Sequence, residues 1–204
     1  MQTWKAVILC SWAAIFSCAV PERRIVDKAM PEEARGAGQQ VVLASQLSQP
    51  EGPVGEKMKW LSLQEAAAAL AKEKKPVLID LYTDWCGWCK VMDKRTYGHA
   101  KVSAYVQEHF YPVKIDAESK QTFSWNGREF SYNSGNKVND LAIWLTGGQL
   151  SFPTTVFIPV GGEPQAIPGF LPPNEFELLA KYFGEDHFGK TDFVKYRQQF
   201  KSSW

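Results

Sequence analysis

The amino-acid sequence predicts an α/β fold, with helices on both faces of a small mixed β-sheet. Three apolar, β-prone runs, at 77–82, 111–116 and 153–158, indicate the central strands. Segments of helical composition lie before, between and after these runs. Strands that alternate with helices are typical of a sheet packed between helical layers.

In the first half of the folded part, the sequence predicts a helix, a strand, two helices and a second strand. Ser62 and Glu65 form a capping-box pattern in front of an alanine-rich run, which predicts a helix that starts there. Pro76 closes this segment. The elements expected up to residue 116 are a helix through 66–71, a strand at 77–82, helices at 86–95 and 101–109, and a strand at 111–116.

The second half contains a hairpin before the third central strand. Asn126 and Gly127 separate two aromatic-rich alternating runs, a strong local signal for a β-hairpin. We expect this insertion to cover the core rather than to widen a docking surface. The elements expected after residue 121 are a hairpin over 122–132, a helix at 137–146, strands at 153–158 and 165–167, a helix capped by Asn174 and ending near 183, and a last amphipathic helix at 192–201.

Length and composition set broad limits on function. A chain of 204 residues allows one domain with appendages or two small ones. The net charge of +1, without a basic run, gives no electrostatic reason to expect nucleic acid as a partner.

The N-terminus has the pattern of an export signal. One positive charge precedes an apolar run over 6–20, which has the length of a signal-peptide core and is short for a membrane span. Ile15-Phe16-Ser17-Cys18 resembles a bacterial lipoprotein signal, in which the cysteine is lipidated and becomes the first mature residue. We expect a signal peptide over 1–18, lipid on Cys18 and a location in the periplasm or cell envelope. Cleavage after Ala19, giving a secreted protein, and an uncleaved anchor are the alternatives.

A tether rich in Pro, Gly and polar residues follows, and we expect a flexible linker over 19–57 and a folded domain over 58–204. Cys10 would leave with the signal and Cys18 would carry lipid, so Cys86 and Cys89 remain in the soluble part. This pair therefore does not belong to a disulfide-stapled scaffold.

The two cysteines stand two residues apart, directly after a strand and at the start of a predicted helix. The positive end of the helix dipole lowers a thiol pKa and makes the sulfur of Cys86 a nucleophile. We expect Cys86 to be the more exposed, attacking sulfur, and Cys89, one turn on, to resolve the mixed disulfide. An inert disulfide that constrains a local turn is the alternative.

Residues 77–90, with their Trp-Cys-Gly-Trp-Cys-Lys motif, resemble the active-site segment of the thioredoxin superfamily. Residues 113–116 are similar to that family's next central strand, and 152–155 to the loop that carries its cis-proline. The resemblance covers about 58–184. Trp88, the lysine after the motif and the insertion at 123–132 are most similar to envelope thioredoxin-related proteins, which include the C-terminal domain of the membrane thiol:disulfide interchange protein.

The resemblance implies a thioredoxin fold with a hairpin and helix inserted before the cis-Pro strand, and an extra C-terminal helix. It implies an exported thiol–disulfide oxidoreductase, acting as a reductase without a cofactor or metal, that exchanges electrons with protein cysteines and with an envelope electron donor or acceptor. The catalytic residues it implies are Cys86, Cys89, Asp80 as a buried proton acceptor, and Pro153. The substrate-contacting residues are Trp85, Gly87, Trp88, Phe152 and Thr154.

Several other interpretations of these residues stay open. Asp80 could be a solvated acid at a strand edge, Trp85 could fill the core, and Lys90 could either favour the thiolate or only be solvated. One alternative function is a substrate-binding or chaperone-like module without redox turnover. The other is a metal carrier, for which the candidate ligands besides the cysteines are His99, His109, Asp84 and Asp93.

Overall fold

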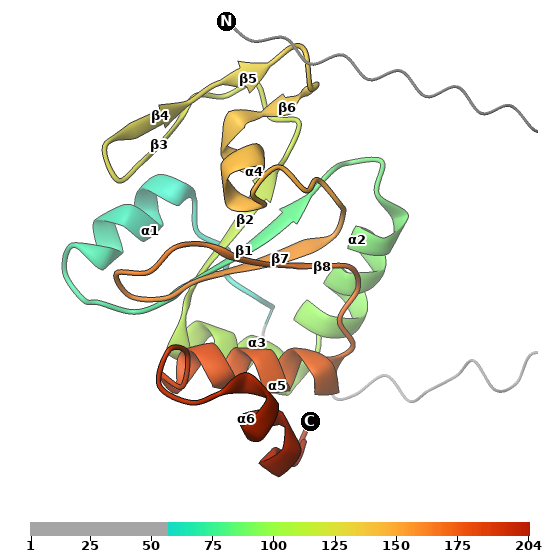
Figure 1. Ribbon diagram of the computed structural model, residues 1–204. Coiled ribbons are helices and arrows are strands. Elements are labelled where there is room, and N and C mark those ends of the chain that lie inside the picture. Colours follow the sequence, from blue (N-terminus) through green and yellow to red (C-terminus); the bar gives the residue numbers. More distant parts are fainter. Residues whose placement is uncertain (1–56) are drawn as a thin grey trace, which may run out of the picture. The chain divides into compact units, whose positions relative to one another are not determined.

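The computed structural model describes residues 57–204 (Figure 1). The predicted signal peptide 1–18, with Cys18, and all of the predicted linker 19–57 except Lys57 lie outside the described residues. The main helices and strands, in chain order, are α1 (Leu63–Leu70), β1 (Val77–Tyr82), α2 (Gly87–Met92), the π-helical η1 (Asp93–Tyr97), α3 (Ala100–His109), β2 (Tyr111–Asp116), α4 (Asp140–Leu145), β7 (Thr154–Ile158), β8 (Gln165–Pro168), α5 (Pro173–Gly184) and α6 (Phe193–Gln199).

The central sheet has four strands in the order β2-β1-β7-β8, with β1 parallel to β2 and the other neighbours antiparallel. Alternate residues of a strand point to opposite faces, so each face has its own core. One face packs against α1 and α4 through side chains that include Ile79 of the sheet. The other packs against α3 and α5 through a cluster that includes Leu78. The predicted mixed sheet between helices is therefore confirmed.

The helix after the cysteines departs from the expected one. We predicted a single helix over 86–95, but the α-helix ends at Met92 and continues as a π-helical turn from Asp93 to Tyr97. The wider turn allows the adjacent side chains of Thr96 and Tyr97 both to be buried. The Thr96 hydroxyl there donates a hydrogen bond to the Leu171 carbonyl.

Between β2 and β7 the chain forms the predicted hairpin and a second, shorter one. Strands β3 (Phe123–Trp125) and β4 (Arg128–Phe130) pair across Asn126 and Gly127. Both turn residues have positive φ, 50° and 75°, as a tight hairpin turn requires. The aromatic side chains of the insertion that join the core are Phe123, Trp125 and Phe130.

The helix predicted over 137–146 starts three residues late. Strands β5 (Tyr132–Asn133) and β6 (Val138–Asn139) pair as a hairpin in front of it. Lys137 has a φ of 57°, which a right-handed helix does not accept. The side chain of Asn139 then caps α4.

The C-terminal part has the two predicted helices with one changed start. Asn174 does not cap α5, because the helix begins at Pro173, and Pro172 occupies the cap position. Proline fits the first helical position, since its fixed φ is helical and no N–H is needed there. Asp192 caps α6, the expected extra C-terminal helix. Within 57–204, no helix is both long and apolar enough to cross a membrane.

Candidate active site

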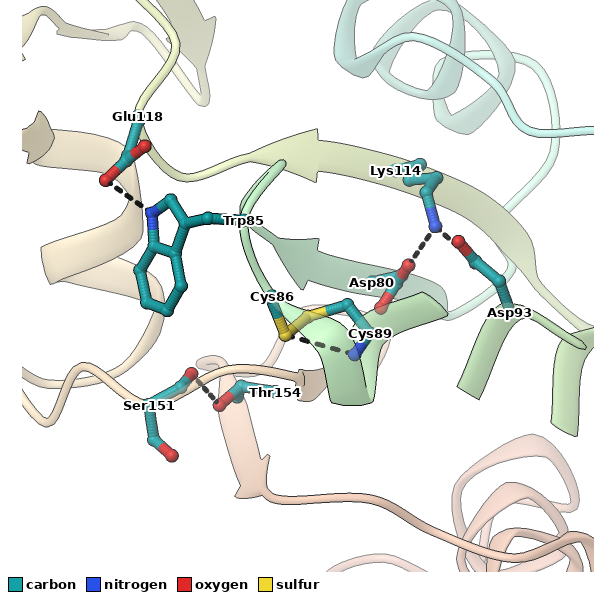
Figure 2. The surroundings of a disulfide bond; sticks show 9 residues. All are labelled: Asp80, Trp85, Cys86, Cys89, Asp93, Lys114, Glu118, Ser151 and Thr154. Atoms are coloured by element: carbon teal, nitrogen blue, oxygen red, sulfur yellow. Dashed lines mark hydrogen bonds and ion pairs between the residues drawn. A yellow bond between two sulfur atoms is a disulfide. The ribbon is translucent and has the colours of Figure 1, made fainter. Parts of the chain in front are cut away.

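Cys86 and Cys89 form a disulfide at the first turn of α2 (Figure 2). Their sulfurs are 2.07 Å apart and their Cα atoms 5.3 Å apart. Cys86 is the N-cap residue of α2, and its Sγ accepts a hydrogen bond from the Cys89 backbone N–H at 3.0 Å. A free N–H at a helix start stabilises negative charge, so a Cys86 thiolate would be favoured at this position.

The two cysteines do not differ in exposure as we expected. Each is 4% exposed in the disulfide form, so the prediction of a more exposed Cys86 is wrong at the level of whole residues. The helix start distinguishes them instead, because Cys86 accepts an N–H as the cap while Cys89 lies inside the helix. A Cβ at Gly87 would meet no atom within 4 Å, so the surface beside the disulfide is open at this residue.

Asp80 is buried on β1, 2% exposed, and faces Lys114 on β2. The Lys114 Nζ lies 2.5 Å from Asp80 Oδ2, and it also binds the carboxylate of Asp93 on η1 (Figure 2). The solvated strand-edge position that we left open for Asp80 is therefore excluded. Burial raises the pKa of Asp80 to about 6, against the opposing effect of Lys114.

Aromatic rings enclose the Lys114 ammonium. Its Nζ lies 4.8 Å from the ring centre of Tyr82, 5.2 Å from that of Trp60 and 6.0 Å from that of Tyr97. Burial lowers the pKa of Lys114, but the two carboxylates outweigh it and the net shift is upward. The lysine therefore stays charged beside Asp80 across the physiological pH range.

Trp85 and Trp88 stand on the surface on either side of Cys86. Trp85 is 67% exposed, so the core-filling role left open for it is excluded. Its ring meets Phe152 edge-on at 6.0 Å, and its indole N–H donates to Glu118 at 3.0 Å. Trp88 is 61% exposed and its ring centre lies 5.6 Å from that of Phe170.

A shallow groove of about 290 Å³ lies beside Trp88. Its lining residues are Trp88, Phe152, Pro153, Gly169 and Phe170. The peptide bond before Pro153 is cis, as the resemblance implied. Because the groove is apolar and adjoins the cysteine motif, it is suited to hold a side chain of a docked polypeptide.

The remaining predicted residues have more limited surroundings. Thr154 is buried, and its hydroxyl donates to the Ser151 carbonyl within the same loop (Figure 2). Lys90 is exposed on α2. Among residues 57–204, no group of three or more His, Cys, Asp or Glu side chains is arranged to hold a metal ion.

Three polar residues of the site were not predicted from the sequence: Lys114, Tyr97 and Glu118. Lys114 had a visible signal, since it is a charged residue between the buried Val113 and Ile115 of β2. Tyr97 and Glu118 had none, because one lies on a π-helical turn and the other in a loop.

Comparisons with known proteins agree with this geometry. The thioredoxin-like domain family matches residues 63–184. Thioredoxin of Borreliella burgdorferi is 31% identical over 109 residues, which is 53% of this chain and 74% of that protein. The thiol:disulfide interchange protein DsbD of Ralstonia nicotianae is 39% identical over 67 residues, or 31% of this chain.

The match to DsbD spans 11% of that protein's length. A solved DsbH oxidoreductase superposes with a TM-score of 0.44 and 21% identity, covering 66% of this chain and 88% of its own. The family match extends over most of the described residues and includes both cysteines, Asp80 and Pro153. The chain belongs to the thioredoxin-like domain family, within the thioredoxin superfamily, and is related to DsbD.

Proposed function

We propose that this protein is an exported thiol–disulfide oxidoreductase, with 58–204 as its catalytic domain, that reduces disulfides in other proteins. The observation that carries the proposal is the Cys86–Cys89 disulfide at the first turn of α2, next to an apolar groove. Similarity to a thioredoxin and to a thiol:disulfide interchange protein supports this chemistry.

The proposed reaction consists of two successive thiol–disulfide exchanges. The Cys86 thiolate of the reduced protein attacks one sulfur of a partner disulfide, so a mixed disulfide forms and one partner thiolate leaves. Cys89, as a thiolate, then attacks Cys86 Sγ, which forms the Cys86–Cys89 disulfide and releases the second partner thiolate. Two electrons pass to the partner, and an external dithiol must reduce the pair again.

Asp80 is the proposed acceptor of the Cys89 proton in the second step. Its carboxyl is buried, and its pKa of about 6 lets it exchange a proton near neutral pH.

The proposed docking surface is formed by Trp85, Gly87, Trp88, Phe152 and Pro153, of which both tryptophans are exposed. The Thr154 hydroxyl donates a hydrogen bond to the Ser151 carbonyl and so fixes the loop that bears Phe152 and Pro153.

The reduction potential of the Cys86–Cys89 couple and an insulin reduction assay test this function together. A potential of about −270 mV, like that of thioredoxin, indicates a reductase, and one of about −120 mV indicates an oxidant. We expect a value close to the first, with insulin reduction abolished by Cys86→Ser in a protein that still folds. Partner function retained by Cys86→Ser would instead indicate a binding module.

The proposed location is the cell envelope, with a lipid on Cys18 and 19–57 as a tether. The support for it is the sequence pattern of residues 1–18. Mass spectrometry of the protein from a bacterial host that lipidates proteins tests it, since a lipidated Cys18 predicts a diacylglycerol-sized mass increase that Cys18→Ser removes. An unmodified N-terminus after Ala19 would support secretion without an anchor.

A further inference from the structure

The loop between β2 and β3 connects the cysteine motif to the insertion. Its Glu118 accepts the indole N–H of Trp85, the residue directly before Cys86, at 3.0 Å (Figure 2). Trp85 is 67% exposed, and its ring contact is with Phe152 at 6.0 Å. An indole this exposed has little packing to hold it, so its orientation depends on the position of Glu118.

Asn139 fastens this loop from inside the protein. Its side chain is fully buried, and its Nδ2 donates hydrogen bonds to the carbonyls of Ser119 at 3.1 Å and Gln121 at 2.8 Å. Its backbone N–H donates to the Ala117 carbonyl at 2.7 Å. These three bonds span the loop on both sides of Glu118.

The same side chain also caps α4, because its Oδ1 accepts the Leu141 N–H at 3.0 Å. Both amide hydrogens and the amide oxygen of Asn139 are thus engaged. At the other end of the loop, the Glu118 N–H donates to Asp116 Oδ1 at 3.0 Å. A buried and fully bonded amide is a rigid anchor, since releasing it leaves polar groups unpaired.

We propose that Asn139 is a positioning residue for partner docking: through the 117–121 loop and Glu118, it fixes the Trp85 indole beside the disulfide. The insertion thereby takes part in the recognition of protein substrates, since Asn139 closes its second hairpin. This inference rests on the proposed function. Binding of a partner large enough to contact Trp85 depends on the Asn139 anchor. The reaction of a small disulfide that reaches only Cys86 does not.

The test uses Asn139→Asp in the full chain. This change keeps the side-chain oxygen that caps α4, because aspartate and asparagine cap helices equally well, but it removes both Nδ2 donors. The reduced protein is assayed with insulin and with the small disulfide 5,5′-dithiobis(2-nitrobenzoic acid). We expect KM for insulin to rise about fivefold more than any change towards the small disulfide. This is the order expected when the single Trp85–Glu118 hydrogen bond at the docking surface is lost.

Glu118→Ala removes the same connection from the loop itself, where a substitution leaves the fold intact because the side chain is partly exposed. If Asn139 acts through Glu118, the double variant loses no more than the stronger single variant. Effects that multiply would overturn the inference. Amide hydrogen exchange over 117–121 adds a measurement free of activity, and unchanged exchange in Asn139→Asp would also overturn it.

Asn133→Asp is the matched control, because it makes the same chemical change in the same insertion. The Asn133 side-chain amide donates to Asp140 at 2.9 Å and not to a carbonyl of the loop that holds Glu118. We expect its insulin KM to match that of the unmodified protein. An equal loss in this control, or an equal loss of Asn139→Asp towards both substrates, would contradict the inference. Failure of the unmodified protein with both substrates would refute the proposed function instead.

Discussion

Asp80 and Lys114 are direct neighbours across the parallel strands β1 and β2, and the Lys114 ammonium contacts the buried Asp80 carboxyl at 2.5 Å. The same ammonium binds Asp93, which is 44% exposed. One cation thus connects a buried acid to an acid at the surface. Burial and this lysine together set the proton affinity of Asp80, and substitutions of Asp80 and Lys114 test the two effects.

Asp80→Asn is expected to stabilise the protein at pH 7.5. The pKa of Asp80 is raised from 3.8 to about 6, so the folded state binds this proton more tightly than the unfolded state. The contribution of Asp80 therefore favours folding below pH 3.8 and is lost as the pH rises through 6. We expect a gain of about 2 kcal/mol in the free energy of unfolding by urea at pH 7.5, and none at pH 4.

The exposed Asp84 is the control for this experiment, because Asp84→Asn removes the same charge from the same segment without a buried environment. It should change the free energy of unfolding by less than about 0.5 kcal/mol at both pH values. A less stable Asp80→Asn protein at pH 7.5 would show that the ion pair with Lys114 outweighs the desolvation of Asp80.

Lys114→Met is expected to shift the pH dependence of the resolving step upward. Lys114 opposes the effect of burial on Asp80, so its removal raises the pKa of Asp80 above about 6. Stopped-flow measurement of mixed-disulfide decay between pH 5 and 9 should then show an inflection at higher pH than in the unmodified protein. An unchanged inflection would mean that Asp80 does not accept the Cys89 proton.

Cys89→Ser is expected to trap the mixed disulfide between Cys86 and a partner. The serine hydroxyl cannot attack Cys86 Sγ, so the second exchange stops while the first proceeds. Non-reducing gel electrophoresis after mixing with insulin should show one adduct that dithiothreitol removes. The matched Cys86→Ser should give none, and an adduct of similar yield there would assign the attacking sulfur to Cys89.

Glu177→Ala is expected to destabilise the protein at neutral pH. Glu177 is fully buried on α5, and it accepts hydrogen bonds from Lys181 at 2.7 Å, Ser202 at 2.6 Å and the Trp204 N–H at 3.1 Å. These bonds lower its pKa from 4.5 to about 2 against the effect of burial. Loss of the carboxylate should cost about 2 kcal/mol by thermal or urea unfolding at pH 7.

The pH dependence of this loss has the opposite sign to that of Asp80. A carboxyl whose pKa is lowered on folding stabilises the protein above its unfolded value, and that stability disappears as the pH falls through 4.5 towards 2. The difference between Glu177→Ala and the unmodified protein should therefore shrink in this range. A difference that is constant with pH would assign the effect to packing alone.

Local patterns accounted for most of the secondary structure. The strands β1 and β2 and the Asn126-Gly127 hairpin occur where the sequence predicts them, because apolar β-prone runs and turn chemistry act over a few residues. The errors fell where two local signals competed. Residues 137–139 directly precede a helix, but the positive φ of Lys137 and the pairing of Asn139 with Tyr132 delay its start.

Two cysteines one helical turn apart after a buried strand could be predicted from short-range patterns, because that arrangement depends on neighbouring residues. Which distant side chains contact the residues of this segment depends on tertiary packing. Strand register brings Lys114 to Asp80, and the buried amide of Asn139 holds the loop that carries Glu118 to Trp85. Such pairings join residues 18 to 34 positions apart, and no short-range pattern specifies them, since they depend on how the sheet and the insertion pack.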